Sequence, residues 1–140
     1  MAKIAPFCGL RYNGEKLENL AEVVMPPYDV LSPDEQEFLH QISPYNMVHL
    51  ELGKSTPADS ETDNPHTRAA KYLREWQREA VLIRDRQPAL YYYELDYTVG
   101  LGQRRTRYGF ICRLLLEDFS SGSVRPHEKT FQAVKDERLS

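Results

Sequence analysis

The sequence predicts an α+β domain with a mixed, largely antiparallel sheet and two to three helices. Three observations support this class. Two segments carry helix start signals, in which Ser or Asn directly precedes a proline. Two long segments joined through "GLGQ" are typical of a β-hairpin. The predicted order is strand, helix, strand, helix and then antiparallel strands, which is not the regular alternation of a parallel α/β fold.

Length and composition indicate one folded domain. A chain of 140 residues is about the size of a single domain, and 41% hydrophobic residues are enough for a core. We find no internal linker and expect one domain over residues 1–140. The net charge of −3 argues against a dedicated nucleic-acid-binding protein, whose domains are usually basic.

The first third of the chain predicts a strand, a stiff loop and a helix. The segment "AKIAPFCGLRY" is expected to be a strand that ends at Asn13-Gly14, and residues 22–25 form a short extended run. Pro26-Pro27 ends this run and presents "YDV" on a stiff loop. Ser32 is then the predicted N-cap of a helix that reaches about Ile42.

The middle of the chain predicts a strand and a second helix. "NMVHLEL" alternates as a half-buried strand does, so His49 is expected to have a structural role, whereas His40 and His66 are expected on helix surfaces. After a polar loop, Asn64-Pro65 starts a helix. Its apolar positions share one face: Ala69, Tyr72, Leu73, Trp76 and Ala80.

The last third predicts a short strand in "AVLIRD", a long hairpin and a turn at "SSGS". The hairpin arms are "PALYYYELDYTV" and "RRTRYGFICRLLLE". Alternation along a strand divides the first arm into two faces. One face carries Tyr92, Glu94, Asp96 and Thr98, and the other carries Tyr91, Tyr93, Leu95, Tyr97 and Val99.

The two cysteines and the lengths of the apolar runs indicate in which cellular compartment the protein is expected. Cys8 and Cys112 each lie in an apolar run, so we expect buried structural thiols, with a disulfide or redox role as the alternative. The N-terminus lacks the apolar core of a signal peptide. No apolar run approaches the ~20 residues of a membrane span. We therefore expect a cytoplasmic protein that does not enter the membrane.

The densest chemistry lies in "HEKT". Pro126 precedes His127, and the residues that follow can form a helix, so the motif would lie at a helix N-terminus that favours an anion. Lys129 and Thr130 could bind phosphate, while Glu128 could act as a base or bind a divalent cation. His127 could donate to an anion or act as a base near neutral pH. The alternative is a capped helix start with solvated charges.

Two further stretches are candidates. Asp29, on the stiff proline loop, could orient a substrate or metal ion; the alternative is a structural turn in which nearby backbone groups satisfy its carboxylate. Arg104, Arg105 and Arg107 lie around the hairpin turn, with Arg105 and Arg107 on one strand face. Arg107 is a candidate phosphate-binding residue, with tyrosines available for base stacking. The alternative is a solvated strand face.

Taken together, these segments resemble a known bacterial family, the domain-of-unknown-function family 1015. The combination of "PPYDV" with "HEKT" about 100 residues later is specific, and the resemblance covers essentially the whole chain. Family members are usually longer, which implies that this chain is an N-terminal portion. One departure is Glu137-Arg138, where the family pattern has an Asp-Arg pair.

The family is distantly similar to the ParB/sulfiredoxin-like group, which includes nucleotide-hydrolysing partition proteins, ATP-using sulfiredoxins and free-serine kinases. "MPPYDV" is placed like the first box of that group and "HEKT" like the phosphate-binding box. The similarity implies a nucleotide-dependent phosphotransferase or nucleotide hydrolase, with ATP, ADP or another nucleotide and Mg²⁺. Glu128, His127 and Asp29 would be catalytic, Lys129 and Thr130 would bind phosphate, and Glu128 would bind the metal.

Two alternatives come from other classes. A non-catalytic ligand-sensing or DNA-associated module would use the arginines of the hairpin. A purely structural domain would need another part of a longer protein for activity.

Overall fold

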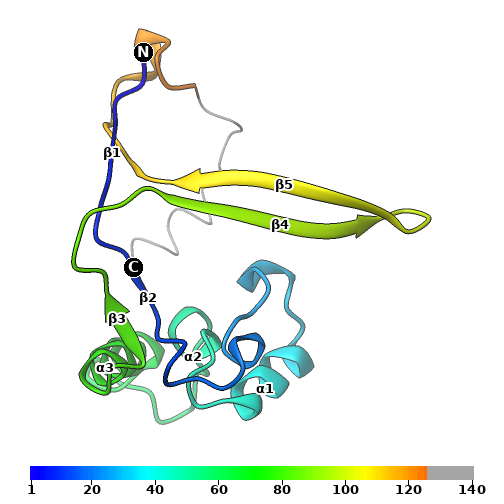
Figure 1. Ribbon diagram of the computed structural model, residues 1–140. Helices are drawn as coiled ribbons and strands as arrows, with labels where there is room; N and C mark the ends of the chain where they lie inside the picture. Colours follow the sequence, from blue (N-terminus) through cyan, green and yellow to red (C-terminus); the bar gives the residue numbers. More distant parts are fainter. Residues whose placement is uncertain (126–140) are drawn as a thin grey trace. The chain divides into compact units, whose positions relative to one another are not determined.

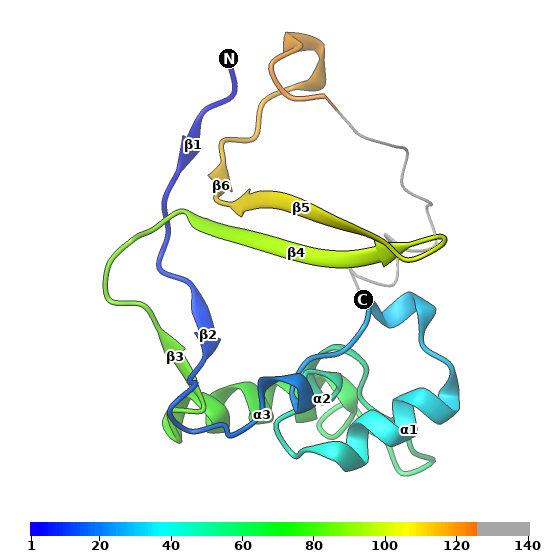
Figure 2. The same ribbon diagram turned by 45° about the vertical axis from the view of Figure 1, so that its right-hand side comes forward.

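The computed structural model describes residues 1–125. It confirms the α+β class, with three α-helices and three two-stranded antiparallel sheets in the described part of the chain (Figures 1 and 2). The chain divides into two compact units. We call Gly9–Arg86 the helical unit, and the described residues of the other, 1–8 and 87–125, the hairpin unit. The single domain expected from the sequence stays a prediction.

Helix α1, Pro33–Ile42, begins where the sequence predicts. Ser32 caps it: the Ser32 hydroxyl oxygen accepts from the Glu35 backbone N–H at 3.3 Å, and the Glu35 carboxylate accepts from the Ser32 backbone N–H at 2.9 Å. This reciprocal capping box satisfies two backbone donors that the first helical turn leaves without partners. The local sequence alone is therefore sufficient to start this helix.

Helix α3, Pro65–Arg78, follows the same rule. The Asn64 side chain accepts from the backbone N–H groups of His66 and Thr67, both at 3.0 Å. Of the predicted apolar face, Trp76 is 2% exposed, while Leu73 is 37% exposed. The predicted face is therefore the one that packs against the core, and Trp76 is its buried residue.

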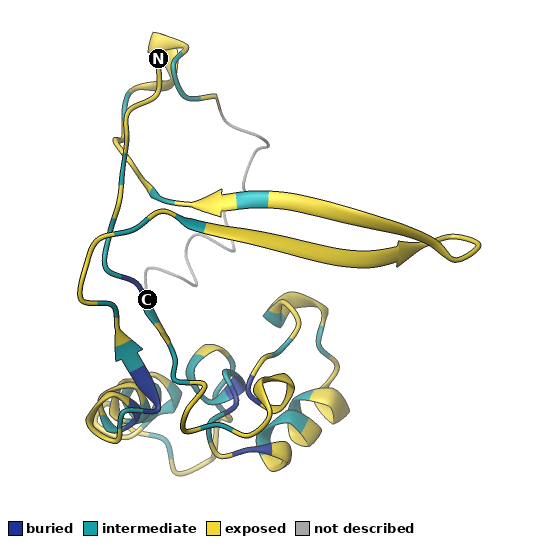
Figure 3. Ribbon diagram, in the orientation of Figure 1, coloured by how far each residue is buried: buried dark blue, intermediate teal, exposed yellow. Residues whose placement is uncertain are grey.

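The core of the helical unit forms around the end of α3. Trp76, Val81 and Leu82 are buried together, and Leu82 begins strand β3, Leu82–Arg84. β3 pairs antiparallel with β2, Leu10–Tyr12. The rings of Tyr12, Tyr45 and Tyr72 lie within 6.3 Å of the Trp76 ring, centroid to centroid. Figure 3 shows the beginning of β3 in dark blue, the colour of buried residues.

The half-buried strand predicted for "NMVHLEL" is wrong, because Val48–Glu51 form a short helix, α2. Asn46 is fully buried, and its side-chain oxygen accepts from the Val48 backbone N–H at 2.9 Å. This contact favours a helical turn. The extended run expected over residues 22–25 is also only partly correct, because the 3₁₀-helix η1 covers Leu20–Glu22.

The first predicted strand is interrupted. Ile4–Ala5 form β1, which pairs antiparallel with β6, Arg113–Leu114, whereas β2 belongs to the helical unit. Pro6 follows β1 directly and has no backbone N–H to continue a ladder. The predicted single strand is thus two short strands.

The predicted hairpin is confirmed, although its second arm is shorter than expected, because Arg113–Leu114 pair with β1 as β6. β4, Tyr91–Val99, pairs antiparallel with β5, Gln103–Ile111, from Tyr91 opposite Ile111 to Val99 opposite Gln103. Gly100 and Gly102 have positive φ angles of 51° and 83°, which glycine adopts without steric cost. Most of the ribbon is exposed, as the yellow β4 and β5 of Figure 3 show.

The remaining expectations concern the cysteines and the membrane. Cys8 and Cys112 are partly buried and form no disulfide. The "SSGS" turn lies at the 3₁₀-helix η3, Phe119–Ser121. Within residues 1–125, no helix has the length and apolar character needed to span a membrane.

Tyr12 makes the helical unit sensitive to alkaline pH. Its hydroxyl donates to the Tyr45 carbonyl oxygen at 2.7 Å, and burial raises its pKa from 10.0 to about 12. Between these values the unfolded chain loses a proton that the folded chain keeps, so stability falls as the pH rises. After allowance for the half-exposed ring, we expect a loss of about 1 kcal/mol between about pH 9 and about pH 11.

Urea unfolding of the wild type and of Tyr12→Phe at both pH values measures this loss. Since phenylalanine does not titrate, the variant should lose less stability than the wild type over the same interval. Equal losses in the two proteins would contradict the assignment to Tyr12.

Candidate functional site

The proline loop is anchored at its start by a buried asparagine. The Asn46 side-chain amide donates to the carbonyl oxygens of Glu22 and Val24, at 2.8 and 3.0 Å. The Met47 backbone N–H donates to the Val23 carbonyl oxygen at 2.8 Å. Asn46 therefore fastens the chain just before Pro26-Pro27 to the start of α2.

The loop itself has the stiff geometry that the sequence predicts. Pro27 has φ −51° and ψ 137°, close to polyproline geometry. Tyr28–Val30 then form the 3₁₀-turn η2, closed by the Val30 backbone N–H donating to the Pro27 carbonyl oxygen at 3.2 Å. This turn presents Asp29 shortly before the N-cap of α1.

Asp29 is exposed. Within residues 1–125, no hydrogen bond or ion pair engages its carboxylate. Among residues 1–125, the backbone contact expected under the structural-turn alternative is not seen at Asp29. An unengaged carboxylate on a rigid loop is available for a ligand or a cation.

An open pocket of about 410 Å³ lies beside this loop. Most of its lining is apolar, and it carries one carboxylate. The lining residues are Met25, Pro26, Pro27, Tyr28, Met47 and Glu51. The strand expected for this region hides Glu51 from sequence reasoning. The signal that could have found it is Asn46, whose side-chain oxygen accepts from the Val48 backbone N–H at the start of α2.

The other predicted site residues are not brought to this loop by the described structure. His127, Glu128, Lys129 and Thr130 lie outside the described residues. Arg107 is exposed on β5 in the hairpin unit, whereas Asp29 belongs to the helical unit. The joint site of Asp29, Arg107 and the "HEKT" side chains therefore stays a prediction.

The arginines of the hairpin lie on the faces that the sequence predicts. Arg105 is opposite Tyr97, and Arg104 is opposite Thr98, so the two lie on different faces. The Arg107 guanidinium lies 5.9 Å from the centre of the Tyr97 ring, which is within cation–π range. All three arginines are exposed.

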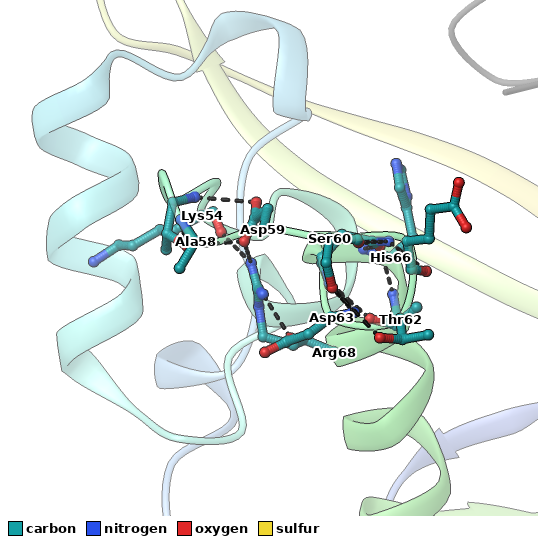
Figure 4. Close-up of polar contacts among 12 residues, drawn as sticks. Lys54, Ala58, Asp59, Ser60, Thr62, Asp63, His66 and Arg68 are labelled. Atoms are coloured by element: carbon teal, nitrogen blue, oxygen red, sulfur yellow. Dashed lines mark hydrogen bonds and ion pairs between the residues drawn. The ribbon is translucent and has the colours of Figure 1, made fainter.

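A polar network organises the loop before α3 (Figure 4). The Arg68 guanidinium donates to the carboxylates of Asp59 and Asp63, at 2.9 and 2.7 Å, and to the Lys54 carbonyl oxygen at 2.8 Å. The Lys54 ammonium pairs with Glu37 of α1. These cations are therefore matched by carboxylates, and we read the network as structural.

Two histidines meet beside this network, which corrects the expectation for His40 and for His49. His40 is half-buried on α1 rather than a surface residue, and His49 lies on α2 rather than on a strand. Burial, followed by the nearby charge of His40, lowers the pKa of His49. The expected structural role of His49 fits its packing against Tyr72, with ring centres 5.4 Å apart. His66 is exposed on α3, as expected.

Metal ligands do not cluster in the described part of the chain. Within residues 1–125, no group of three or more His, Cys, Asp or Glu side chains is placed to hold a metal ion. A metal site built on Asp29 would therefore need ligands from a substrate, from water or from the residues that follow position 125.

Comparison with known proteins places the chain in a protein family. The family described as "Protein of unknown function (DUF1015)" matches residues 4–140. The chain belongs to this family, as the resemblance of its motifs implies. No curated protein and no solved structure matched the chain significantly.

Proposed function

We propose that the protein is a nucleotide-dependent phosphotransferase or nucleotide hydrolase, with the proline loop as one wall of its site. The observation that carries the proposal is the exposed carboxylate of Asp29 on a short turn, which no hydrogen bond or ion pair engages among residues 1–125. A carboxylate held in this way can orient a nucleophile or bind Mg²⁺ without first breaking an internal contact.

The pocket beside the loop suits the less polar part of such a ligand. Apolar side chains with a few polar groups are the usual lining of small-molecule sites. Met25, Met47 and the two prolines supply apolar surface, and the carboxylate of Glu51 can accept from an amino group of a base. The nucleotide base would occupy this pocket.

The phosphate side of the site rests on the sequence. Lys129 and Thr130 would hold phosphate oxygens, with His127 as a donor or base. Glu128, with Asp29, would provide the carboxylate oxygens that Mg²⁺ prefers. The similarity to the ParB/sulfiredoxin-like group that the motifs imply favours this arrangement by analogy. A cytoplasmic location is part of the same proposal.

Nucleotide titration of the full chain tests the proposal. We expect ATP with Mg²⁺ to raise the melting temperature, since a ligand at about 1,000 times its dissociation constant stabilises the folded state by about 4 kcal/mol. Asp29→Asn and Lys129→Ala should each weaken binding about tenfold or more, because each removes a charged contact. A thermal-shift titration with ATP, ADP and CTP, with and without Mg²⁺, measures the rise in melting temperature, and its dependence on nucleotide concentration measures the affinity.

Asp34→Asn is the matched control. Asp34 is also exposed and lies five residues further along, in the first turn of α1. Its substitution should leave nucleotide affinity unchanged. Absence of any nucleotide effect, or equal losses in Asp29→Asn and Asp34→Asn, would overturn the role of the loop.

A second candidate is a DNA-associated or ligand-sensing module that uses the hairpin. The observation that favours it is the Arg107 guanidinium over the Tyr97 ring, on a face that also carries Arg105. Arginine and aromatic side chains together are typical of surfaces that bind single-stranded nucleic acid. Binding that weakens steeply with salt, in a protein without nucleotide affinity, would favour this candidate.

A further inference from the structure

His40 and His49 face each other directly between α1 and α2. Their Nδ1 atoms are 3.2 Å apart, and the ring planes are nearly perpendicular at 88°. His40 lies in the last turn of α1 and His49 in α2, so the contact joins the two helices.

The hydrogen bond made by the second nitrogen, Nε2, of each ring determines whether Nδ1 can carry a proton. His40 Nε2 is 3.1 Å from the Leu52 carbonyl oxygen, and His49 Nε2 is 3.2 Å from the Ser43 carbonyl oxygen. Since a carbonyl oxygen only accepts, each Nε2 carries a proton. A neutral imidazole then has a lone pair at Nδ1, and two lone pairs would face each other at 3.2 Å. One additional proton converts this repulsion into a hydrogen bond.

The surroundings indicate which ring holds the proton. His40 lies at the C-terminal end of α1, where the helix dipole favours a cation, and Glu37 lies one turn earlier. His49 packs against the Tyr72 and Trp76 rings, and burial favours its neutral form. A proton between the two Nδ1 atoms would therefore be donated by the His40 ring to a neutral His49.

Among residues 1–125, the cations that line the pocket beside the pair, Lys54 and Arg68, are paired with carboxylates. The pair lines a pocket of about 300 Å³ together with Lys54, Arg68 and Tyr72. From α1, Glu37 pairs with Lys54; from α3, Arg68 pairs with two aspartates. The pocket gives protons access to the rings.

We propose that His40 and His49 share one proton, and that this hydrogen bond is a pH-sensitive lock between α1 and α2. The hydrogen bond between the histidines lies close to elements of the proposed ligand site. α1 begins shortly after the Asp29 turn, and α2 carries Glu51 in the pocket beside that turn. A change of protonation in the pair would alter the packing of α1 against α2, the helix that contributes Glu51 to the proposed ligand pocket.

Acid opens the lock by adding a second proton. The lowered pKa of His49 means that the folded chain resists protonation where the unfolded chain accepts it, below the ordinary value of 6.5. Stability is therefore lost as the pH falls from this value towards the folded pKa. In that interval the unfolded chain binds up to one proton more than the folded chain. The unfolding constant therefore rises by up to about tenfold for each pH unit by which the pH falls.

Two measurements on the full chain test the proposal. Long-range proton–nitrogen NMR spectra of the histidine rings at about pH 7 should show one imidazolium and one neutral ring protonated at Nε2 in the pair. Two neutral rings, or two rings that titrate independently at the ordinary value, would overturn it. This measurement needs no variant.

Chemical unfolding between about pH 7 and about pH 5 is the second measurement. In His40→Gln, which removes the donor ring, the acid-induced rise of the unfolding constant should be reduced at least threefold relative to the wild type. His66→Gln is the matched control, because His66 is exposed on α3 and should leave the pH profile unchanged. A wild-type profile retained by His40→Gln would contradict the lock.

Discussion

Replacing Asn46 with alanine is expected to destabilise the helical unit by about 3 kcal/mol, because three buried or half-buried backbone groups lose their partner. These groups are the carbonyl oxygens of Glu22 and Val24 and the backbone N–H of Val48. The side chain of Asn46 is fully buried, so water does not replace these contacts without rearrangement. Urea unfolding followed by circular dichroism measures the loss.

The same substitution should affect the proposed site. The chain before Pro26-Pro27 would lose its attachment to α2, so nucleotide affinity should fall in Asn46→Ala even under conditions where the protein stays folded. Asn19→Ala is the matched control, since Asn19 is exposed and caps only the short η1. It should cost about 1 kcal/mol or less. Equal losses in the two variants would contradict the anchoring role of Asn46.

Trp76→Ala is expected to cost about 3–5 kcal/mol, the range for removing a large aromatic side chain from a core. Trp76 is 2% exposed and contacts the rings of Tyr12, Tyr45, Tyr72 and His49. The cavity left by its indole ring would open between α3, α2 and β2. Circular dichroism during urea unfolding is the suitable measurement, because the only tryptophan of the chain is removed.

Leu73→Ala on the same helix face provides the comparison. Leu73 is 37% exposed, so its substitution should cost about 1 kcal/mol. Trp76→Phe, which keeps an aromatic ring, should fall between the two. A loss in Trp76→Ala no larger than in Leu73→Ala would show that the core does not depend on the tryptophan.

Local rules predict the capped helices and the hairpin from sequence. Ser32 and Asn64 start their helices by contacts to residues within the next turn, so neighbours in the chain are sufficient. The hairpin is equally local, because Gly100 and Gly102 reverse the chain between two arms of matching length. The stiff turn at Pro27 follows from the proline ring itself.

The errors fall where distant residues compete with the local pattern. "NMVHLEL" has the alternation of a strand. The Asn46 side chain, however, donates to carbonyl oxygens at residues 22 and 24 and accepts from the Val48 backbone N–H, and these contacts favour the helical turn α2. His40 and His49 are nine residues apart in sequence, and only the packing of α1 on α2 brings their Nδ1 atoms to 3.2 Å. No periodicity in the sequence carries that information.

The sequence by itself determined the starts of α1 and α3 and the hairpin, because each depends on contacts close along the chain. It also determined the α+β class and the family, since the order of the elements and the motifs can be recognised without their contacts. Only the tertiary structure decided that Asp29 is exposed, that Glu51 lines the neighbouring pocket and that two histidines share a contact. These properties depend on which side chains burial brings together. Burial is a property of the whole packed unit, and neighbouring residues in the chain do not specify it.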